Sequence, residues 1–106
     1  MDNLCLVSNY YFFKDRETFT GVVKDECGTI AYYLNGGFHR TDGPALIDYY
    51  GDKVWYLNDK LTREDGPAVE RSNGYKEWYL NCKCYGFNDD FTNESWIRFV
   101  QLELLK

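Results

Sequence analysis

A period of 23 residues constrains this chain more than any other feature of its sequence. The tripeptide Tyr-Leu-Asn begins at Tyr33 and recurs at Tyr56 and at Tyr79. The tetrapeptide Asp-Gly-Pro-Ala begins at Asp42 and recurs at Asp65, which is the same interval. A fixed spacing of this kind indicates stacked copies of one supersecondary unit, because each copy exposes an apolar face that its neighbour covers. The sequence therefore predicts an array of short units.

Each unit is predicted to be a β-hairpin. Alternating runs rich in aromatic and β-branched residues predict strands over residues 45–49, 53–58, 68–71 and 76–81. Glycine-bearing segments such as Tyr50-Gly51-Asp52 join the strands within a unit. The Asp-Gly-Pro segments join successive hairpins, with proline at the first position of a strand, where its missing N–H does no harm. The expected fold is mainly β, an antiparallel meander of tandem 23-residue hairpin repeats.

The C-terminal segment changes to a helical pattern. Thr92 or Asn93 can cap the N-terminus of a helix over residues 94–105, whose apolar residues form a wide arc. We expect this helix to cap the open end or the core face of the sheet. A helix that docks a partner would show the same pattern, so both interpretations remain open.

The length of 106 residues fits one domain. Within this single repeat domain, 1–106, we expect three parts. They are a degenerate N-terminal repeat, the regular hairpin repeats and the capping helix, over residues 1–27, 28–91 and 92–106.

The period of two along a strand predicts which face of the sheet is buried. Trp55 and Leu57 share one face, and the other copies place an aromatic residue and a leucine at the same positions. We assign this face to the core. The opposite face carries the repeated tyrosines and asparagines, and we expect it to be open to a partner.

The expected partner-binding residues lie on that open face and in the acidic stretch around the start of the helix. They are Tyr33, Tyr56, Tyr79, Asn35, Asn58, Asp89, Asp90 and Glu94. Tyrosine suits binding because it offers a rigid ring and a hydroxyl at a low entropy cost. The alternative is that the tyrosines only stiffen the sheet through cross-strand contacts worth about 0.2 to 1 kcal/mol per pair.

The sequence shows no catalytic motif. His39 is the only histidine, so imidazole-based acid–base or metal chemistry would depend on one residue, and we expect it to stabilise a turn. Asp42 and Asp65 each precede Gly-Pro, where aspartate commonly caps a turn, and each can form an ion pair with the arginine two residues before it. We therefore predict a protein that is not an enzyme and that needs no cofactor.

The four cysteines are Cys5, Cys27, Cys82 and Cys84. They lack the two-residue spacing typical of zinc ligands, and we interpret them as free thiols, with a zinc site as the alternative.

The formal charge of −5, with basic residues interleaved among acids, argues against binding to nucleic acid or to an anionic membrane. No run approaches the roughly 18 apolar residues that cross a bilayer. Met1-Asp2-Asn3 also lacks the basic start of a signal peptide, so we expect a cytoplasmic protein. A homodimer through an unpaired edge strand remains open.

The unit from Tyr32 to Gly36, followed by His39 to Ala45, resembles the MORN-like repeats of phage and large DNA virus proteins. The resemblance covers about residues 28–87 and implies binding, to proteins or sometimes to lipid. It suggests a small phage or viral accessory protein that binds and inhibits a host defence protein in the host cytoplasm. The alternatives are a MORN-like scaffold or membrane-surface module and an antitoxin-like binder.

Overall fold

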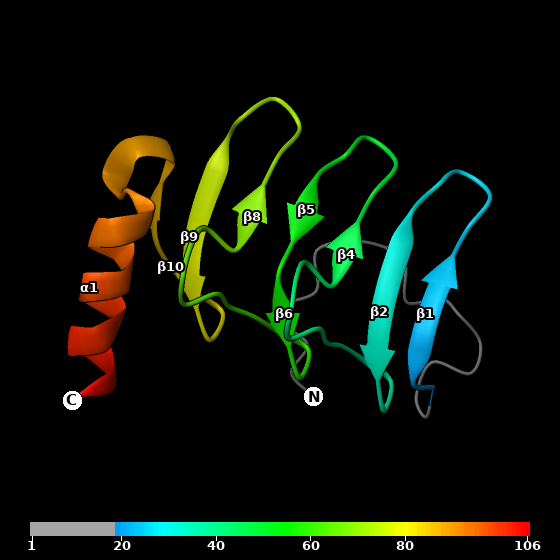
Figure 1. The fold of residues 1–106 in the computed structure, drawn as a ribbon, viewed down its shortest axis with the longest axis horizontal. Coiled ribbons are helices and arrows are strands. Elements are labelled where there is room, and N and C mark those ends of the chain that lie inside the picture. The colour runs from blue at the N-terminus through cyan, green and yellow to red at the C-terminus, as the bar shows by residue number, and fades with distance from the viewer. Residues whose placement is uncertain (1–18) are drawn as a thin grey trace.

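The computed structural model describes residues 19–106 and shows a thin antiparallel sheet with one helix at its C-terminal end (Figure 1). The mainly β fold with a C-terminal helix is therefore confirmed. The main sheet is formed by β1 Gly21–Lys24, β2 Ile30–Leu34, β3 Gly37–Phe38, β4 Leu46–Ile47, β5 Lys53–Val54, β8 Val69–Glu70, β9 Lys76–Leu80 and β10 Lys83–Phe87. Two further strands, β6 Tyr56–Leu57 and β7 Lys60–Leu61, pair with each other. The 3-10 turn Asn88–Asp90 leads into α1, Asn93–Leu104.

The strands follow one another across the sheet in chain order, β1-β2-β4-β5-β8-β9-β10, and β3 pairs with β2. Every pairing is antiparallel. The predicted degenerate N-terminal repeat lies largely in residues 1–18, outside the described residues, and β1 belongs to its remaining part.

Each Tyr-Leu-Asn tripeptide ends in a tight turn that the sequence analysis did not predict. Asn35, Asn58 and Asn81 adopt φ values of 50°, 50° and 48°, and the residue that follows each of them also has a positive φ. Asparagine tolerates this left-handed conformation better than most residues, and two consecutive positive φ values are typical of a type I′ hairpin turn. The chain therefore reverses at each asparagine and adds the return strands β3, β7 and β10.

The return strands decide which face of the sheet is buried. Phe38 lies opposite Tyr33 in the β2–β3 ladder, and Leu61 lies opposite Tyr56 in the β6–β7 ladder. The Phe38 ring lies 5.1 Å from Tyr33 and 4.9 Å from Tyr56, measured between ring centroids. All four side chains are buried in one core cluster. The assignment of the tyrosine face to an open surface was therefore wrong for Tyr33 and Tyr56.

On the other face, the repeated leucine is buried only where α1 covers it. Leu34 and Leu57, which we assigned to the core, are 38% and 37% exposed, whereas the matching Leu80 is 8% exposed beneath the helix. Trp78 is likewise buried, and it packs with Trp96 of α1 in a second core cluster. The predicted core face is thus correct for the last copy and wrong for the two before it.

The helix begins as predicted. The Thr92 hydroxyl accepts a hydrogen bond from the Ser95 N–H, and the Ser95 hydroxyl accepts one from the Thr92 N–H, so two backbone donors at this end are satisfied. Trp96 and Val100 are its buried residues. The apolar arc is wider than the contact it makes, because the leucines of the last turn are exposed. In the described residues, no helix is long and apolar enough to span a membrane.

Candidate binding cleft

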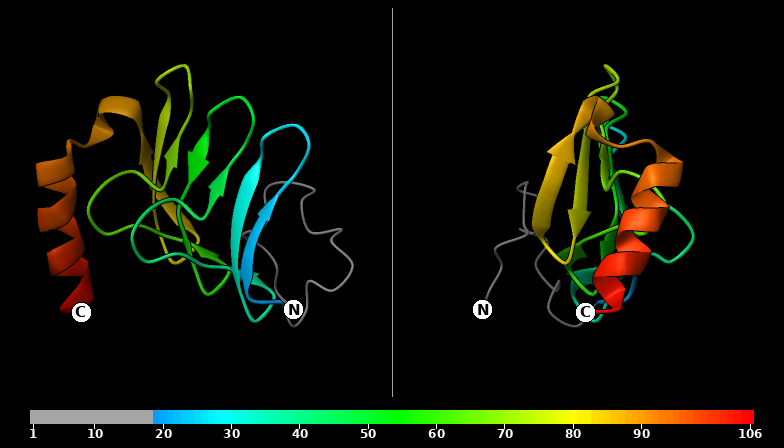
Figure 2. Two further views of the ribbon diagram at one scale, coloured as in Figure 1. Left: turned by 45° about the vertical axis from the view of Figure 1, so that its right-hand side comes forward. Right: turned by 90° about the vertical axis from the view of Figure 1, so that its left-hand side faces the viewer.

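Two loops leave the sheet on the side where α1 lies. They cover residues 39–45 and 62–68, and Figure 2 shows both projecting to the same side as the helix. Each loop is attached to the next tyrosine strand at the same point: the Arg40 N–H donates to the Tyr56 carbonyl oxygen and the Arg63 N–H to that of Tyr79, both at 3.2 Å. We call this side of the sheet the helix side.

An arginine in each loop folds back over an aromatic ring of the sheet. The Arg40 guanidinium carbon lies 4.1 Å from the Tyr32 ring centroid, and that of Arg63 lies 3.9 Å from the Trp55 ring centroid. Stacking of a guanidinium on a ring contributes about 0.5 to 2 kcal/mol, depending on how far the pair is desolvated. The rings that we assigned to a buried core are therefore covered by arginines of their own loops.

The Asp-Gly-Pro motif holds each arginine in place. Arg40 Nε donates to Asp42 Oδ1 at 2.9 Å, and Arg40 Nη1 donates to the Pro44 carbonyl oxygen at 3.1 Å. Arg63 makes the same bonds to Asp65 and to the Pro67 carbonyl oxygen, at 2.9 and 3.0 Å. The predicted arginine–aspartate ion pairs are thus present in both loops.

Glycine at the centre of the motif leaves room for the arginine. A methyl group at Gly43 would lie 2.9 Å from Arg40 Cζ, and one at Gly66 would lie 2.7 Å from Arg63 Cζ. Carbon atoms do not approach this closely without displacement. A larger residue would therefore push the guanidinium off its ring.

A cleft of about 650 Å³ separates the two loops. Its lining comes from both loops and from the strand segment between them: Arg40, Thr41, Asp42, Gly43, Trp55, Tyr56, Leu57, Thr62, Arg63, Glu64 and Asp65. A cavity of this volume is large enough for one or two side chains of a partner or for a small ligand.

The carboxylates lie at the rim of the cleft and the guanidinium groups lie deeper. The side chains of Asp42 and Asp65 are 83% and 75% exposed, whereas those of Arg40 and Arg63 are 24% and 19% exposed. A hydrogen bond and the positive charge from Arg40 lower the pKa of the Asp42 carboxyl below its usual value, so Asp42 stays ionised at neutral pH. The rim therefore presents negative charge.

Arg63 is more fully paired than Arg40. Its Nη1 also lies 3.0 Å from Glu70 Oε2, whereas the residue equivalent to Glu70, 23 positions earlier, is Ile47, which has no charge. The second loop is therefore held by one more ion pair than the first.

The predicted tyrosine ladder does not form an accessible surface. Tyr33 and Tyr56 are 4% and 0% exposed and belong to the core. Tyr79 is half-buried, because the residue opposite it on β10 is Cys84 and not a large apolar side chain. Its hydroxyl donates to Glu77 Oε1 at 3.1 Å, and burial together with the Glu77 carboxylate raises the Tyr79 pKa.

The remaining predicted partner-binding residues are exposed but do not line the cleft. Asn35 and Asn58 occupy tight turns, not the sheet face on which we expected them. Asp89 and Asp90 lie in the 3-10 turn before α1, where Asp90 Oδ2 accepts a hydrogen bond from the Phe87 N–H at 2.8 Å. Glu94 lies in the first turn of the helix.

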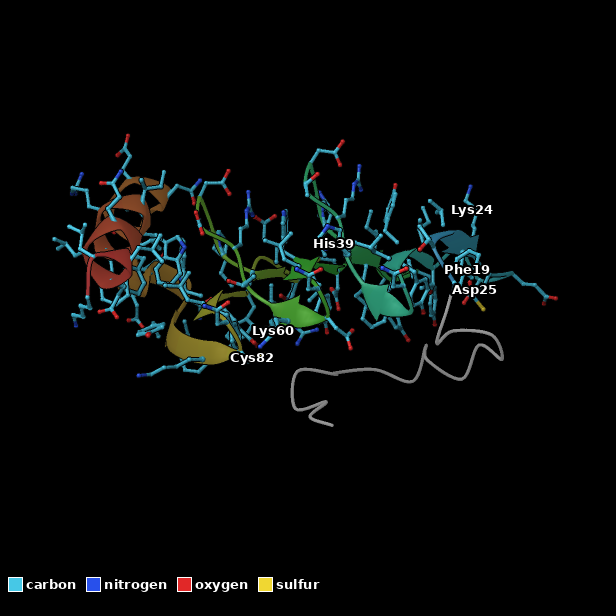
Figure 3. All side chains as sticks on the ribbon, turned by 90° about the horizontal axis from the view of Figure 1, so that it is seen from below. Phe19, Lys24, Asp25, His39, Lys60 and Cys82 are labelled. Carbon is cyan, nitrogen blue, oxygen red and sulfur yellow. The ribbon has the colours of Figure 1, made fainter. Side chains whose placement is uncertain are left out.

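His39 stabilises a turn, as we expected. Its Nδ1 accepts a hydrogen bond from the Asn58 N–H at 2.9 Å, which links one loop to the turn of the next hairpin. Figure 3 shows His39, Lys60 and Cys82 from below, with side chains on both sides of the sheet.

The three cysteines among the described residues are in two states. Cys27 and Cys84 are free thiols, whereas Cys82 is disulfide-bonded, so the interpretation as free thiols was wrong for Cys82. Cys5 lies outside the described residues. Among residues 19–106, no group of three or more histidine, cysteine or acidic side chains could hold a metal ion.

The sequence analysis missed the cleft because it assigned the cleft floor to the core. The available signal was the Arg-x-Asp-Gly-Pro segment, in which each arginine lies eight residues after an aromatic ring: Arg40 after Tyr32 and Arg63 after Trp55.

Comparison of the chain with family models, with curated proteins and with solved structures found no match in any of the three. The MORN-like resemblance therefore stays a prediction from the sequence.

Proposed function

We propose that the chain is a non-catalytic protein-binding module, built as a tandem array of 23-residue hairpin units, and that it binds its partner through the cleft between its two loops. The observation that carries this proposal is that both guanidinium groups of the cleft are already bound by other groups of the same chain. The guanidinium groups of Arg40 and Arg63 are engaged by carboxylates, carbonyl oxygens and aromatic rings. The arrangement is a rigid recognition surface with an exposed apolar floor at Leu57 and an acidic rim.

A protein with a basic surface fits this cleft best. The rim carboxylates and the net charge of −5 would attract lysine and arginine side chains and would speed up the encounter with a basic partner. In the setting that the MORN-like resemblance suggests, the chain is a small phage or viral accessory protein that binds and inhibits a host defence protein.

The test compares two identical substitutions at exposed glutamates. Glu64 lines the cleft, and Glu26 is an exposed residue of the turn between β1 and β2, away from the cleft. The tagged parent chain, Glu64→Lys and Glu26→Lys are used to capture proteins from lysates of candidate host cells. The proposal expects a protein that the parent and Glu26→Lys retain and that Glu64→Lys loses. A partner that all three chains retain equally would place the binding surface elsewhere.

A further inference from the structure

The site that holds α1 consists of a few groups on the helix side of the sheet. The Trp96 indole is buried, its ring centroid lies 5.5 Å from that of Trp78, and its Nε1 donates to the Arg63 carbonyl oxygen at 2.8 Å. Leu80 is buried in the same cluster, and Tyr85 packs beside it. An aromatic ring with one N–H donor is thus the anchor of the helix.

The cleft is the counterpart of this site 23 residues earlier in the chain. Subtraction of 23 from the four positions that receive Trp96, namely 78, 80, 85 and 63, gives Trp55, Leu57, Thr62 and Arg40. All four of these residues line the cleft. The cleft therefore has the parts of a helix-docking site.

Two features show that the counterpart site is open. Leu57 is 37% exposed, whereas Leu80 is 8% exposed beneath α1. The Arg63 carbonyl oxygen accepts the Trp96 indole N–H, but within the described residues no group donates to the carbonyl oxygen of Arg40. An apolar floor and an unused acceptor are both available to an incoming side chain.

One difference sets the geometry of an incoming ring. The third copy has Gly86 where the second has Arg63, so Trp96 lies on Trp78 while the Arg63 guanidinium lies on Trp55. A ring that enters the cleft would therefore pack on Leu57 and against the guanidinium of Arg63, and not on the whole face of Trp55. A guanidinium in contact with two rings gains a second cation–π contact.

We propose that the cleft binds an amphipathic helix of a partner protein, anchored by an aromatic side chain with an N–H or O–H donor and flanked by basic residues. The anchor is inferred from Trp96, and the basic flanks follow from the acidic rim formed by Asp42, Glu64 and Asp65. This inference rests on the proposed function, since it specifies the chemistry of the partner at the same site.

The test uses the α1 sequence as the probe. A fluorescein-labelled peptide of residues 92–106 carries Glu94→Lys and Glu103→Lys, so that its charge complements the rim, and it is titrated with the full-length chain by fluorescence anisotropy. Saturable binding is expected, and it should weaken about tenfold or more when the peptide also carries Trp96→Ala. The unmodified peptide, in which Glu94 and Glu103 are balanced by Arg98 and Lys106, should bind more weakly than the basic one.

A matched pair of variants locates the binding site. Leu57→Arg fills the cleft, whereas Leu34→Arg makes the same change at the equivalent residue of the preceding copy, which is equally exposed and lies outside the cleft. Leu57→Arg should weaken peptide binding about tenfold or more, and Leu34→Arg should change it less than about twofold. Amide chemical shifts of the ¹⁵N-labelled chain should move at Leu57 and Thr62.

Three results would overturn the inference. The first is no binding of the basic peptide at millimolar concentration. The second is equal binding of the peptide by Leu57→Arg and Leu34→Arg, or changes in amide chemical shift confined to Leu80 and Tyr85. The third is a chain that is dimeric by light scattering and becomes monomeric in Leu57→Arg, because the occupant would then be a second copy. If the peptide fails to bind but Glu64→Lys still loses a captured partner, the helix inference fails and the proposed function stands.

Discussion

Replacing Tyr56 by alanine tests which face of the sheet forms the core. Tyr56 is fully buried and its ring lies 4.9 Å from Phe38 in the larger core cluster. A buried aromatic side chain removes about 150 to 250 Å² from water. At about 25 cal/mol per Å² this corresponds to about 4 to 6 kcal/mol, part of which the alanine methyl group retains. We therefore expect Tyr56→Ala to lower the free energy of unfolding by about 3 to 5 kcal/mol.

Urea denaturation followed by circular dichroism measures this change, and the neighbouring residue supplies the control. Leu57 is 37% exposed, so Leu57→Ala should cost only about 1 kcal/mol. For a domain of this size, the Tyr56→Ala loss corresponds to a fall in melting temperature of more than about 12 °C. If Leu57→Ala were the more damaging of the two, or if Tyr56→Ala melted like the parent chain, the assignment of the core to the tyrosine face would be wrong.

Three further changes test the turns, the loops and the helix. Asn58→Val places a β-branched residue at a φ of 50° and should cost about 1 to 2 kcal/mol in urea denaturation, whereas Asn58→Gly should cost less; equal losses would contradict the turn assignment. In an NMR titration, Arg40→Gln should raise the lowered pKa of Asp42 towards its ordinary value. An Asp42 titration that is unchanged in Arg40→Gln would refute the pairing. Because the pKa of Asp42 is lower in the folded state than in the unfolded state, this ion pair stabilises the fold above roughly pH 4. Its contribution to stability is lost as the pH falls through the lowered pKa. Trp96→Ala should lower the free energy of unfolding by about 3 to 5 kcal/mol and expose Leu80; a loss below about 1 kcal/mol would show that α1 does not anchor through this residue.

The period and the glycine-bearing turns of the sequence were sufficient to predict the strand pairs β4–β5 and β8–β9 and the helix, but not the return strands β3, β7 and β10. The recurrence of Tyr-Leu-Asn and of Asp-Gly-Pro-Ala every 23 residues predicted the antiparallel hairpins. Thr92 and the apolar run that follows it predicted the helix to within one residue at each end. Both signals are local in the chain, and local preference and final structure agree there.

The identity of the buried face could not be predicted from the same pattern. Aromatic residues occupy both faces of the tyrosine strands, for example Trp55 and Tyr56, so alternation alone does not distinguish inside from outside. The deciding contacts come from the return strands, which bring Phe38 onto the tyrosine face, and from loops that place an arginine on the opposite ring. Recognition of Asn35-Gly36 as a type I′ turn would have located the first return strand, since this dipeptide is a strong signal for such a turn.

The candidate site was missed for a related reason. Arg40 and Asp42 were correctly predicted to pair, but the sequence did not show that the pair lies above a sheet ring and borders a cleft. That arrangement depends on loops that leave the sheet for seven residues, 39–45 and 62–68, and such loops lack the alternation of apolar and polar residues from which the direction of a side chain is predicted.

The central claim, that the cleft on the helix side binds the partner, is tested most directly by hydrogen–deuterium exchange of the chain with and without a captured partner. The account predicts slower exchange at the backbone amides of the two loops and of Leu57, with unchanged exchange in the turn that carries Tyr49 and Tyr50 at the opposite end of the hairpins. Slower exchange confined to that turn or to the outer face of α1, with the loops unchanged, would contradict it.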